Sequence, residues 1–270
     1  MESGSILMLH IYRQKTPNRW IEICGNIYLQ QILLYNRSMN YPHVTFQYDI
    51  DKDLTNLQIG LNWVGRGAGN DGEINQIIKT HGKTPTNEQL KIYIKDWWIG
   101  REHLKDTIIG PLQKYWDSIE QTFFEKLYEE MQLTSWYTVK EIQSFLSIRY
   151  GCGYNANENW FATSVHSGPL QNTRIAVHEI MHIFFHKQWW QFCKEQNVDE
   201  SSLWDIKESF TTLLNTWFRN ELADKDFGYP QHRELREKIR EWYTETDDFK
   251  ETLIRACAYV KEHPIQQHVV

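Results

Sequence analysis

Two histidines and a glutamate at fixed spacing are the residues of this chain best suited to chemistry. The segment His178-Glu179-Ile180-Met181-His182 fits the pattern H-E-x-x-H. On an α-helix, residues four apart lie on one face, about 6 Å apart along the axis, so both imidazoles can reach one metal ion. Glu179 leaves the helix about 100° further round and can accept a proton from a metal-bound water without being a ligand. The spacing therefore predicts one zinc ion per chain, bound by His178 and His182, with Glu179 as general base.

The residues around this motif are apolar, which predicts a buried helix. Residues 175–177 are Ile-Ala-Val, and residues 183–185 are Ile-Phe-Phe. A helix that is apolar nearly all round lies in a core, where two histidines and a glutamate without partners would be destabilising. A bound cation removes that penalty. The alternative is a core helix with satisfied histidines and a surface glutamate.

At the motif the chain resembles the zincin metallopeptidases, and in particular the gluzincins. The resemblance rests on His178, Glu179 and His182 and on one downstream glutamate, and it spans roughly residues 155–222. It implies that the two histidines bind zinc, that Glu179 is the general base, and that a glutamate on a later helix is the third ligand. Glu208 lies within the spacing that gluzincins use, and we expect it to be this ligand.

Two other sources of a third ligand are excluded by the residues that follow the motif. The metzincin arrangement would place a histidine where this chain has Gln188. His186 continues the four-residue spacing, but on a helix it lies about 12 Å along the axis from His178, too far to share one ion. We expect His186 to be a core residue or a neighbour of a ligand.

Glu208 itself lies opposite an apolar stripe at helical spacing, on a side that carries no further charge until Arg219. The stripe consists of Phe210, Leu213, Leu214, Trp217 and Phe218. Alternatives stay open. Glu208 could be an ordinary exposed residue, or it could form a capping box with Asp205. Asp205 and Glu221 are rival ligands.

The chain departs from the family where an aspartate would orient a zinc histidine. Many gluzincins have it four residues after the ligand glutamate, and this chain has Thr212 there. Because a ligating histidine nearly always has such a partner, another side chain must replace it, and Asn215 is our candidate. The family also uses a tyrosine or histidine to stabilise the oxyanion, and Tyr243 and His232 are the candidates here.

Length and composition are those of a soluble globular protein. The chain has 270 residues, of which 41% are hydrophobic, enough for a sizeable core. Its net charge of −6 argues against general nucleic-acid binding. Four dispersed cysteines without a C-x-x-C pair favour a reducing compartment. The apolar run at residues 6–9 is too short for a signal peptide or a membrane span, so we expect a cytoplasmic protein.

The pattern of elements predicts an α+β fold: a β-containing region at residues 1–100 of unknown role, followed by a mainly helical zincin-like region with a small sheet at residues 101–270. Alternating residues predict a hairpin of two strands at residues 44–50 and 57–63. The glycine-rich segment 65–72 matches G-x-G-x-x-G only formally, because no strand–helix–strand unit follows, and we expect no nucleotide there.

After residue 86 the pattern predicts mostly helices. We expect helices at residues 86–98, from Pro111 to Met131, and from a capping box at Thr138 to Tyr150. A strand at residues 158–166 precedes the motif helix, which we expect to begin near Asn172. In zincins the edge strand of the small sheet pairs with extended substrate; an ordinary connecting strand is the alternative. Two charged helices near residues 230–243 and 247–263 follow.

Together these features predict a zinc-dependent peptidase acting on peptides or proteins, without nucleic-acid or membrane partners. Two alternatives remain: a non-catalytic binding or regulatory module with this fold, or a hydrolase of a non-peptide amide. The sequence does not determine the cleavage preference or the oligomeric state.

Overall fold

A computed structural model of the chain describes residues 41–64, 71–134, 139–222 and 224–265. The chain divides into two units, Met1–Asn40 and Tyr41–Val270, and all described residues belong to the second. Most of the segment at residues 65–72, where no nucleotide is expected, lies outside the described residues.

Within the described residues, four strands form one mixed sheet in the order β1-β2-β4-β3. β1 (His43–Gln47), β2 (Glu141–Ser147) and β4 (Trp160–Ser164) run parallel, and the two-residue strand β3 (Tyr154–Asn155) pairs antiparallel with β4. β1 and β3 are therefore the edges. Residues from both sides of the predicted boundary near residue 100 share this sheet.

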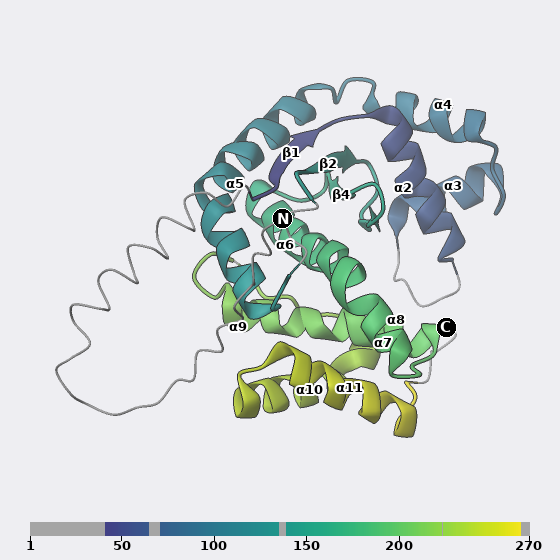
Figure 1. Cartoon of the computed structure of the whole chain (residues 1–270). Helices are drawn as coiled ribbons and strands as arrows, with labels where there is room; N and C mark the ends of the chain where they lie inside the picture. The colour runs from purple at the N-terminus through teal and green to yellow at the C-terminus, as the bar shows by residue number, and fades with distance from the viewer. Residues whose placement is uncertain (1–40, 65–70, 135–138, 223, 266–270) are drawn as a thin grey trace, which may run out of the picture. The chain divides into compact units, whose positions relative to one another are not determined.

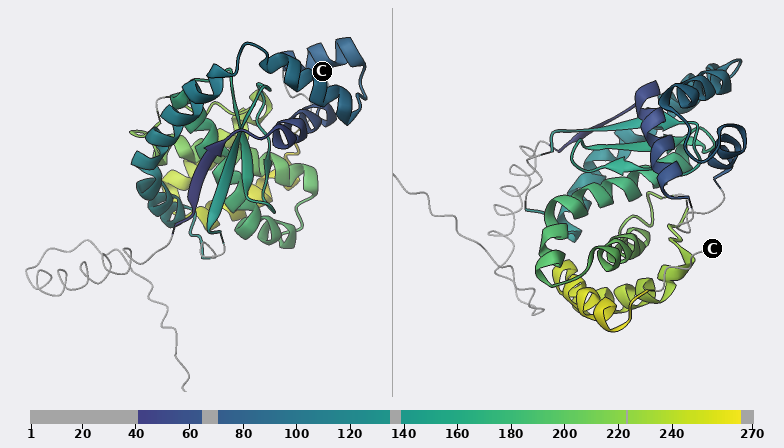
Figure 2. Two further views of the ribbon diagram at one scale, coloured as in Figure 1. Left: turned by 90° about the horizontal axis from the view of Figure 1, so that it is seen from above. Right: turned by 90° about the vertical axis from the view of Figure 1, so that its right-hand side faces the viewer.

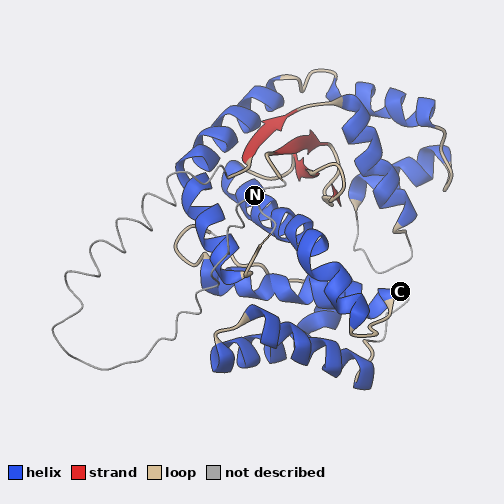
Figure 3. Cartoon of the chain, viewed as in Figure 1, coloured by secondary structure: helices blue, strands red, loops and turns tan. Residues whose placement is uncertain are grey.

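Helices pack around the sheet, and the combination confirms the predicted α+β class (Figure 3). The helices that precede the motif are α2 (Ile50–Asn62), α3 (Gly72–His81), α4 (Asn87–Trp98) and α5 (His103–Glu130). Those that follow β4 are α6 (Pro169–Phe184), α7 (Trp190–Glu195), α8 (Glu200–Phe210), α9 (Leu214–Trp217), α10 (Arg233–Thr246) and α11 (Phe249–Glu262). A π-helical segment, Phe185–Trp189, joins α6 to α7, and short 3-10 helices lie at Thr211–Leu213 and Pro230–His232.

The helices bury two hydrophobic clusters. The larger takes residues from β1, from α5 and α6, and from α8 through α11. The smaller lies between α2, α3, α4 and the end of β2. The motif helix α6 packs against β4, while α10 and α11 lie side by side against α8, on the side of α6 away from the sheet (Figures 1 and 2).

The predicted hairpin is wrong, because its second half is helix α2. The Asp49 side chain accepts hydrogen bonds from the backbone N–H groups of Asp51 and Lys52, which caps the helix. Leu54, Leu57 and Gly60 recur at helical spacing and are buried. The apolar residues at positions 57, 59, 61 and 63 alternate with other residues only by coincidence, because the segment forms an amphipathic helix.

The helix predicted from Thr138 to Tyr150 is also wrong, because β2 occupies residues 141–147. β2 lies between β1 and β4 and is buried along most of its length. A central strand covered on both faces shows no apolar/polar alternation. Its buried residues Ile142, Phe145 and Leu146 therefore imitate helical spacing.

Two predicted helix starts are displaced toward the N-terminus. α5 begins at His103 and contains Pro111 in its interior. α6 begins at Pro169 rather than near Asn172, with Gly168 as N-cap. Asn172 has a different role: its side-chain amide bonds both the backbone N and O of Ser164, each at 3.0 Å, and so covers the end of β4.

The remaining helix predictions are confirmed within a few residues. Thr86 caps α4 through a capping box with Gln89, and α10 and α11 lie where two charged helices were expected. Among the described residues, no helix is both long and apolar enough to cross a membrane.

Candidate metal centre

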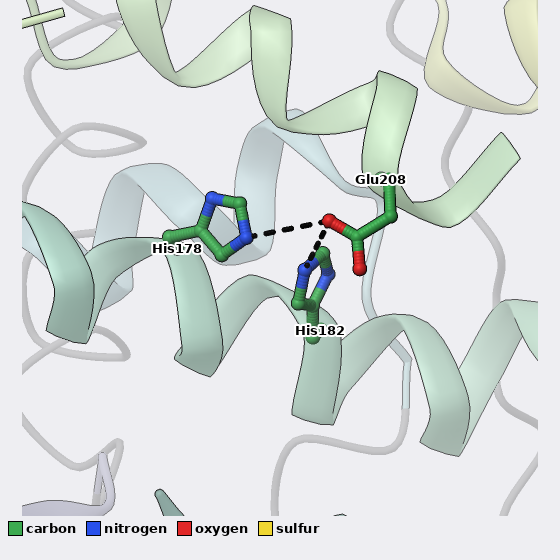
Figure 4. Close-up of side chains that lie close together, drawn as sticks. All are labelled: His178, His182 and Glu208. Carbon is green, nitrogen blue, oxygen red and sulfur yellow. Dashed lines mark ion pairs between the residues drawn. The ribbon is translucent and has the colours of Figure 1, made fainter. Parts of the chain in front are cut away.

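Three side chains from two helices converge on one point. His178 and His182 come from α6, and Glu208 comes from α8, which crosses it (Figure 4). Glu208 Oε2 lies 3.6 Å from His178 Nε2 and 3.3 Å from His182 Nε2. The ligand atoms of the three residues all lie within 4.8 Å of one another. The structure thus brings together the three residues that the sequence predicted as metal ligands.

The geometry of this cluster fits a zinc ion. Ligand atoms held at about 2.0–2.1 Å in a tetrahedron are about 3.3–3.4 Å apart, close to the two distances from Glu208. His182 supplies a second indication. It is 1% exposed, and neither of its ring nitrogens makes a hydrogen bond to a described residue. Buried polar atoms are nearly always paired, so a cation between these residues would account for Nε2.

Asp226 orients the first histidine. Its Oδ2 accepts a hydrogen bond from His178 Nδ1, which leaves Nε2 directed at Glu208. Asn215, the predicted partner of a zinc histidine, acts one step further out: its amide bonds the backbone O and N of Asp226 at 2.8 and 2.7 Å. Thr212 is buried, and its hydroxyl accepts a hydrogen bond from Arg240 Nη1 at 3.4 Å. No spacing links Asp226 to the motif, so no pattern in the sequence points to it.

The surroundings shift the two histidines in opposite directions. Burial disfavours a charge on His178, but the Asp226 carboxylate outweighs it and raises the pKa of His178 to about 10. Burial and the nearby ammonium of Lys207 lower the pKa of His182 to about 3. Against the effect of burial, Lys207 and the histidines hold the pKa of Glu208 well below its usual range. Glu208 is therefore ionised and His182 neutral, the forms in which they bind a metal, whereas His178 has to release a proton when a metal binds.

Glu179 lies beside the cluster and outside it. It is 6% exposed. Burial, reinforced by the charge of Glu208, raises the pKa of Glu179 to about 7 despite the opposing charge of His178. A carboxylate in this position next to a metal site is placed for proton transfer.

A buried lysine holds the second oxygen of Glu208. Lys207 Nζ lies 2.6 Å from Glu208 Oε1 and donates to Tyr154 Oη at 3.0 Å, and its side chain is fully buried. Tyr154 Oη is also 2.8 Å from His186 Nε2. Glu208 is thus left with only Oε2 for a metal, and His186 is linked to Glu208 through Tyr154 and Lys207. No pattern in the sequence points to Lys207 or Tyr154.

The rival ligands are occupied elsewhere or lie outside the cluster. Asp205 Oδ1 pairs with His232 Nε2 at 2.9 Å. The capping box of Asp205 with Glu208 is wrong, because the N-cap of α8 is Asp199. Glu221 has one unpaired buried oxygen, but it does not belong to the group of residues able to hold a metal.

The tyrosines near the centre differ from the predicted one. The Tyr243 hydroxyl donates to Glu130, away from the ligands. Partial burial and the charges of Glu208 and Glu179 raise the pKa of Tyr229, although this residue is 43% exposed. Tyr154 and Tyr229 are therefore the tyrosines that experience the charges of the centre.

Comparisons of the chain with protein-family models, with curated proteins and with solved structures found no match. The role of each residue therefore has to be inferred from the geometry of the centre.

Proposed function

We propose that this chain is a zinc-dependent hydrolase that cleaves peptide bonds. His178, His182 and Glu208 hold one zinc ion, and Glu179 is the general base. The observation that carries the proposal is the convergence of these side chains from two helices, together with the ring nitrogens of His182, which are buried and make no hydrogen bond to a described residue. A site with three protein ligands leaves a position open for water, as catalytic zinc sites do.

Zinc bound there supplies a Lewis acid that polarises a carbonyl and acidifies water. The residues of the chain do the rest. Glu179 takes a proton from the attacking water and transfers it to the leaving amine. Asp226 holds the ring of His178 with Nε2 toward the site, and Lys207 occupies Oε1 of Glu208. His178 and Glu208 are thereby each limited to one donor atom.

A polypeptide is the substrate class that the sheet favours. β3 is an edge of the sheet, and its Tyr154 reaches Lys207 and His186 beside the ligands. An extended peptide can add to such an edge through main-chain hydrogen bonds. The predicted edge, β4, is unsuitable because β2 and β3 flank it and Asn172 covers its end.

We further propose the reducing interior of a cell as its location. Cys193 and Cys257 are buried free thiols. A hydrogen bond with the Cys257 thiol is the first cause of the raised pKa of Cys193, so the two residues are neighbours. Free cysteines, dispersed along the chain without a C-x-x-C pair, are typical of proteins in compartments that keep thiols reduced.

The test combines metal analysis with a mixed peptide library read by mass spectrometry. We expect one zinc per chain in the wild type and in Glu179→Gln, and none in His182→Ala. Only the wild type should cleave peptides, with a loss of at least about 10²–10⁴-fold in Glu179→Gln. Glu237→Gln, on the exposed side of α10, is the matched control and should cleave normally.

Three results would overturn parts of this proposal. A wild type that binds no zinc removes the metal centre. Loss of zinc from Glu179→Gln makes Glu179 a ligand. Full activity of that variant places the base elsewhere.

A further inference from the structure

A buried arginine from a helix that carries no ligand contacts both halves of the metal centre. Arg236 of α10 is 3% exposed. Its Nη2 donates to Asp226 Oδ1 at 3.0 Å and to the backbone O of Asp226 at 2.7 Å. Its Nη1 donates to the backbone O of Glu208 at 3.1 Å and to Thr211 Oγ1 at 2.7 Å. One guanidinium therefore joins the residue that orients His178 to the main chain of the third ligand.

The two oxygens of Asp226 divide between these partners. Oδ2 takes the Nδ1 hydrogen of His178 and Oδ1 takes Arg236. A carboxylate held at both oxygens cannot rotate, so the plane of the His178 ring depends on where the guanidinium lies. The planar fork of donors makes arginine suited to such a contact, and lysine has no equivalent.

The chain segment after Asp226 is shaped to admit this guanidinium. Gly228 has a φ of +63°, and a Cβ built on it would lie 2.5 Å from Arg236 Nη1 and 2.7 Å from Cζ. A side chain at this position would be strained by the backbone angle and would collide with the arginine. Asn215 fixes the same segment from the opposite side through the backbone of Asp226. Arg236 is thus enclosed by residues whose conformations depend on it.

We propose that Arg236 is a positioning residue of the metal centre, and that it fixes the separation and orientation of His178 and Glu208 without touching the ion. This inference rests on the metal site proposed above. It assigns α10 a part in metal binding although the helix contributes no ligand. Outer partners of metal ligands typically change metal affinity by about 10–100-fold when they are removed.

Charge alone would act in the opposite direction. A guanidinium near the site repels a dication, so removing it should strengthen zinc binding if Arg236 acted only through its charge. Arg236→Met removes both the positive charge and the planar set of guanidinium donors. Arg236→Lys keeps the charge and removes the planar donors. Gly228→Ala keeps the arginine but displaces its guanidinium. A positioning role predicts weaker zinc binding in all three variants, by about 10–100-fold in Arg236→Met.

Zinc affinity is measured by competition with a chromophoric chelator, and ligand geometry by the visible spectrum of the cobalt(II)-substituted protein. Urea unfolding of the metal-free variants shows how much of each effect is loss of fold. Arg240→Met, at a more exposed position one turn further along α10, is the matched control: Arg240 donates to Thr212 and not to Asp226 or Glu208, and the variant should bind zinc like the wild type. We expect an altered cobalt spectrum in Arg236→Lys and Gly228→Ala, which a purely structural effect on stability would not produce.

The failure of this inference is distinct from failure of the proposed function. If the wild type binds zinc and cleaves peptides while Arg236→Lys and Gly228→Ala match it in affinity and spectrum, Arg236 has no positioning role. Tighter binding in Arg236→Met would show that its charge dominates. If Arg236→Met does not fold, Arg236→Lys and Gly228→Ala decide the question. A wild type without zinc would overturn both proposals.

Discussion

Two polar networks in this chain are both built around an arginine, an aspartate and a glycine. They differ in which buried atoms are left without a hydrogen bond. One joins α2 to β2 through Arg149, and the other joins α6, α8 and α10 through Arg236. Each arginine pairs with an aspartate whose side chain is at most 12% exposed, Asp71 or Asp226. Each also lies against a glycine, since a Cβ on Gly60 would come within 2.5 Å of Arg149 Nε. Similar architecture therefore does not by itself mark a functional site.

The unpaired atoms separate the two networks. In the α2 network Asp53 Oδ1 accepts from Ser147 Oγ at 2.6 Å and from Ile148 N, while Oδ2 makes no direct hydrogen bond and has the indole N–H of Trp98 nearby. Protonation of this single carboxylate removes its buried charge. In the other network the unpaired atoms are imidazole nitrogens of His182, which converge with a carboxylate and a second imidazole. That set of donors suits a metal ion.

Removal of Glu208 should have the largest effect on zinc binding, because it takes a proposed metal ligand from the network of Arg236. We expect Glu208→Ala to weaken zinc binding by more than the roughly 10–100-fold that loss of an outer partner produces. Asp205→Ala and Glu221→Ala are the controls, since these carboxylates lie outside the cluster, and both should keep wild-type affinity. Competition with a chelator measures all three. Tight zinc in Glu208→Ala together with its loss in either control would mean that the third ligand is misassigned.

Removal of Arg149 should destabilise the α2 network and leave the proposed metal centre intact. Arg149→Met leaves Asp71 without its partner at a site where both side chains are nearly buried, and such a loss costs about 3–5 kcal/mol. Urea unfolding measures this cost, and zinc content should stay at one per chain. Arg255→Met makes the same chemical change at a surface ion pair and should have a much smaller effect. Loss of zinc from folded Arg149→Met would show that the networks are coupled.

In the network of Arg236, the sequence predicts the relative placement only of those residues that lie on one helix. His178, Glu179 and His182 are readable because their spacing on α6 fixes their relative placement. Glu208 is reachable through the family resemblance and the polarity of its own helix. Asp226, Arg236 and Tyr154 come from a loop, a distant helix and an edge strand. These three residues reach the site only through tertiary contacts, so no local sequence pattern predicts their roles.

The same reason explains the errors in the fold. The cap at Asp49 could have identified α2, because its side chain bonds the first turn locally. β2 could not be identified in this way. Its apolar residues are buried by α2 and by the two hydrophobic clusters, which take Ile142 and Leu146, and a strand buried on both faces has no period of its own. Local signals were therefore sufficient for helices with caps and insufficient for a central strand.

The smallest expected effect concerns the proton that satisfies Asp53. Burial, reinforced by the charge of Glu73, raises the pKa of Asp53 to about 7, although the donors of Ser147, Ile148 and Trp98 act to lower it. An unfolded aspartate titrates near 3.9. The folded state therefore holds this proton over a range where the unfolded state has lost it. The stability that the protonated form provides is complete below about pH 4, is lost as the pH rises toward 7, and does not change further above that.

Asp53→Asn removes this titration while keeping an oxygen that can accept from Ser147 and Ile148. The free energy of unfolding of the variant minus that of the wild type should therefore rise between pH 5 and pH 7, by up to about 1.4 kcal/mol per pH unit, and then level off. Urea unfolding at pH 5, 6, 7 and 8 gives this difference, and other titrating groups cancel because both proteins contain them. The value at pH 5 reports chiefly the packing of the amide, and the rise reports the proton. A difference that is the same at every pH would mean that Asp53 titrates normally in the folded state. The α2 network would then contain a buried, ionised carboxylate. The proposed contrast, in which a proton neutralises the α2 network and a metal ion binds in the network of Arg236, would no longer hold for the α2 network.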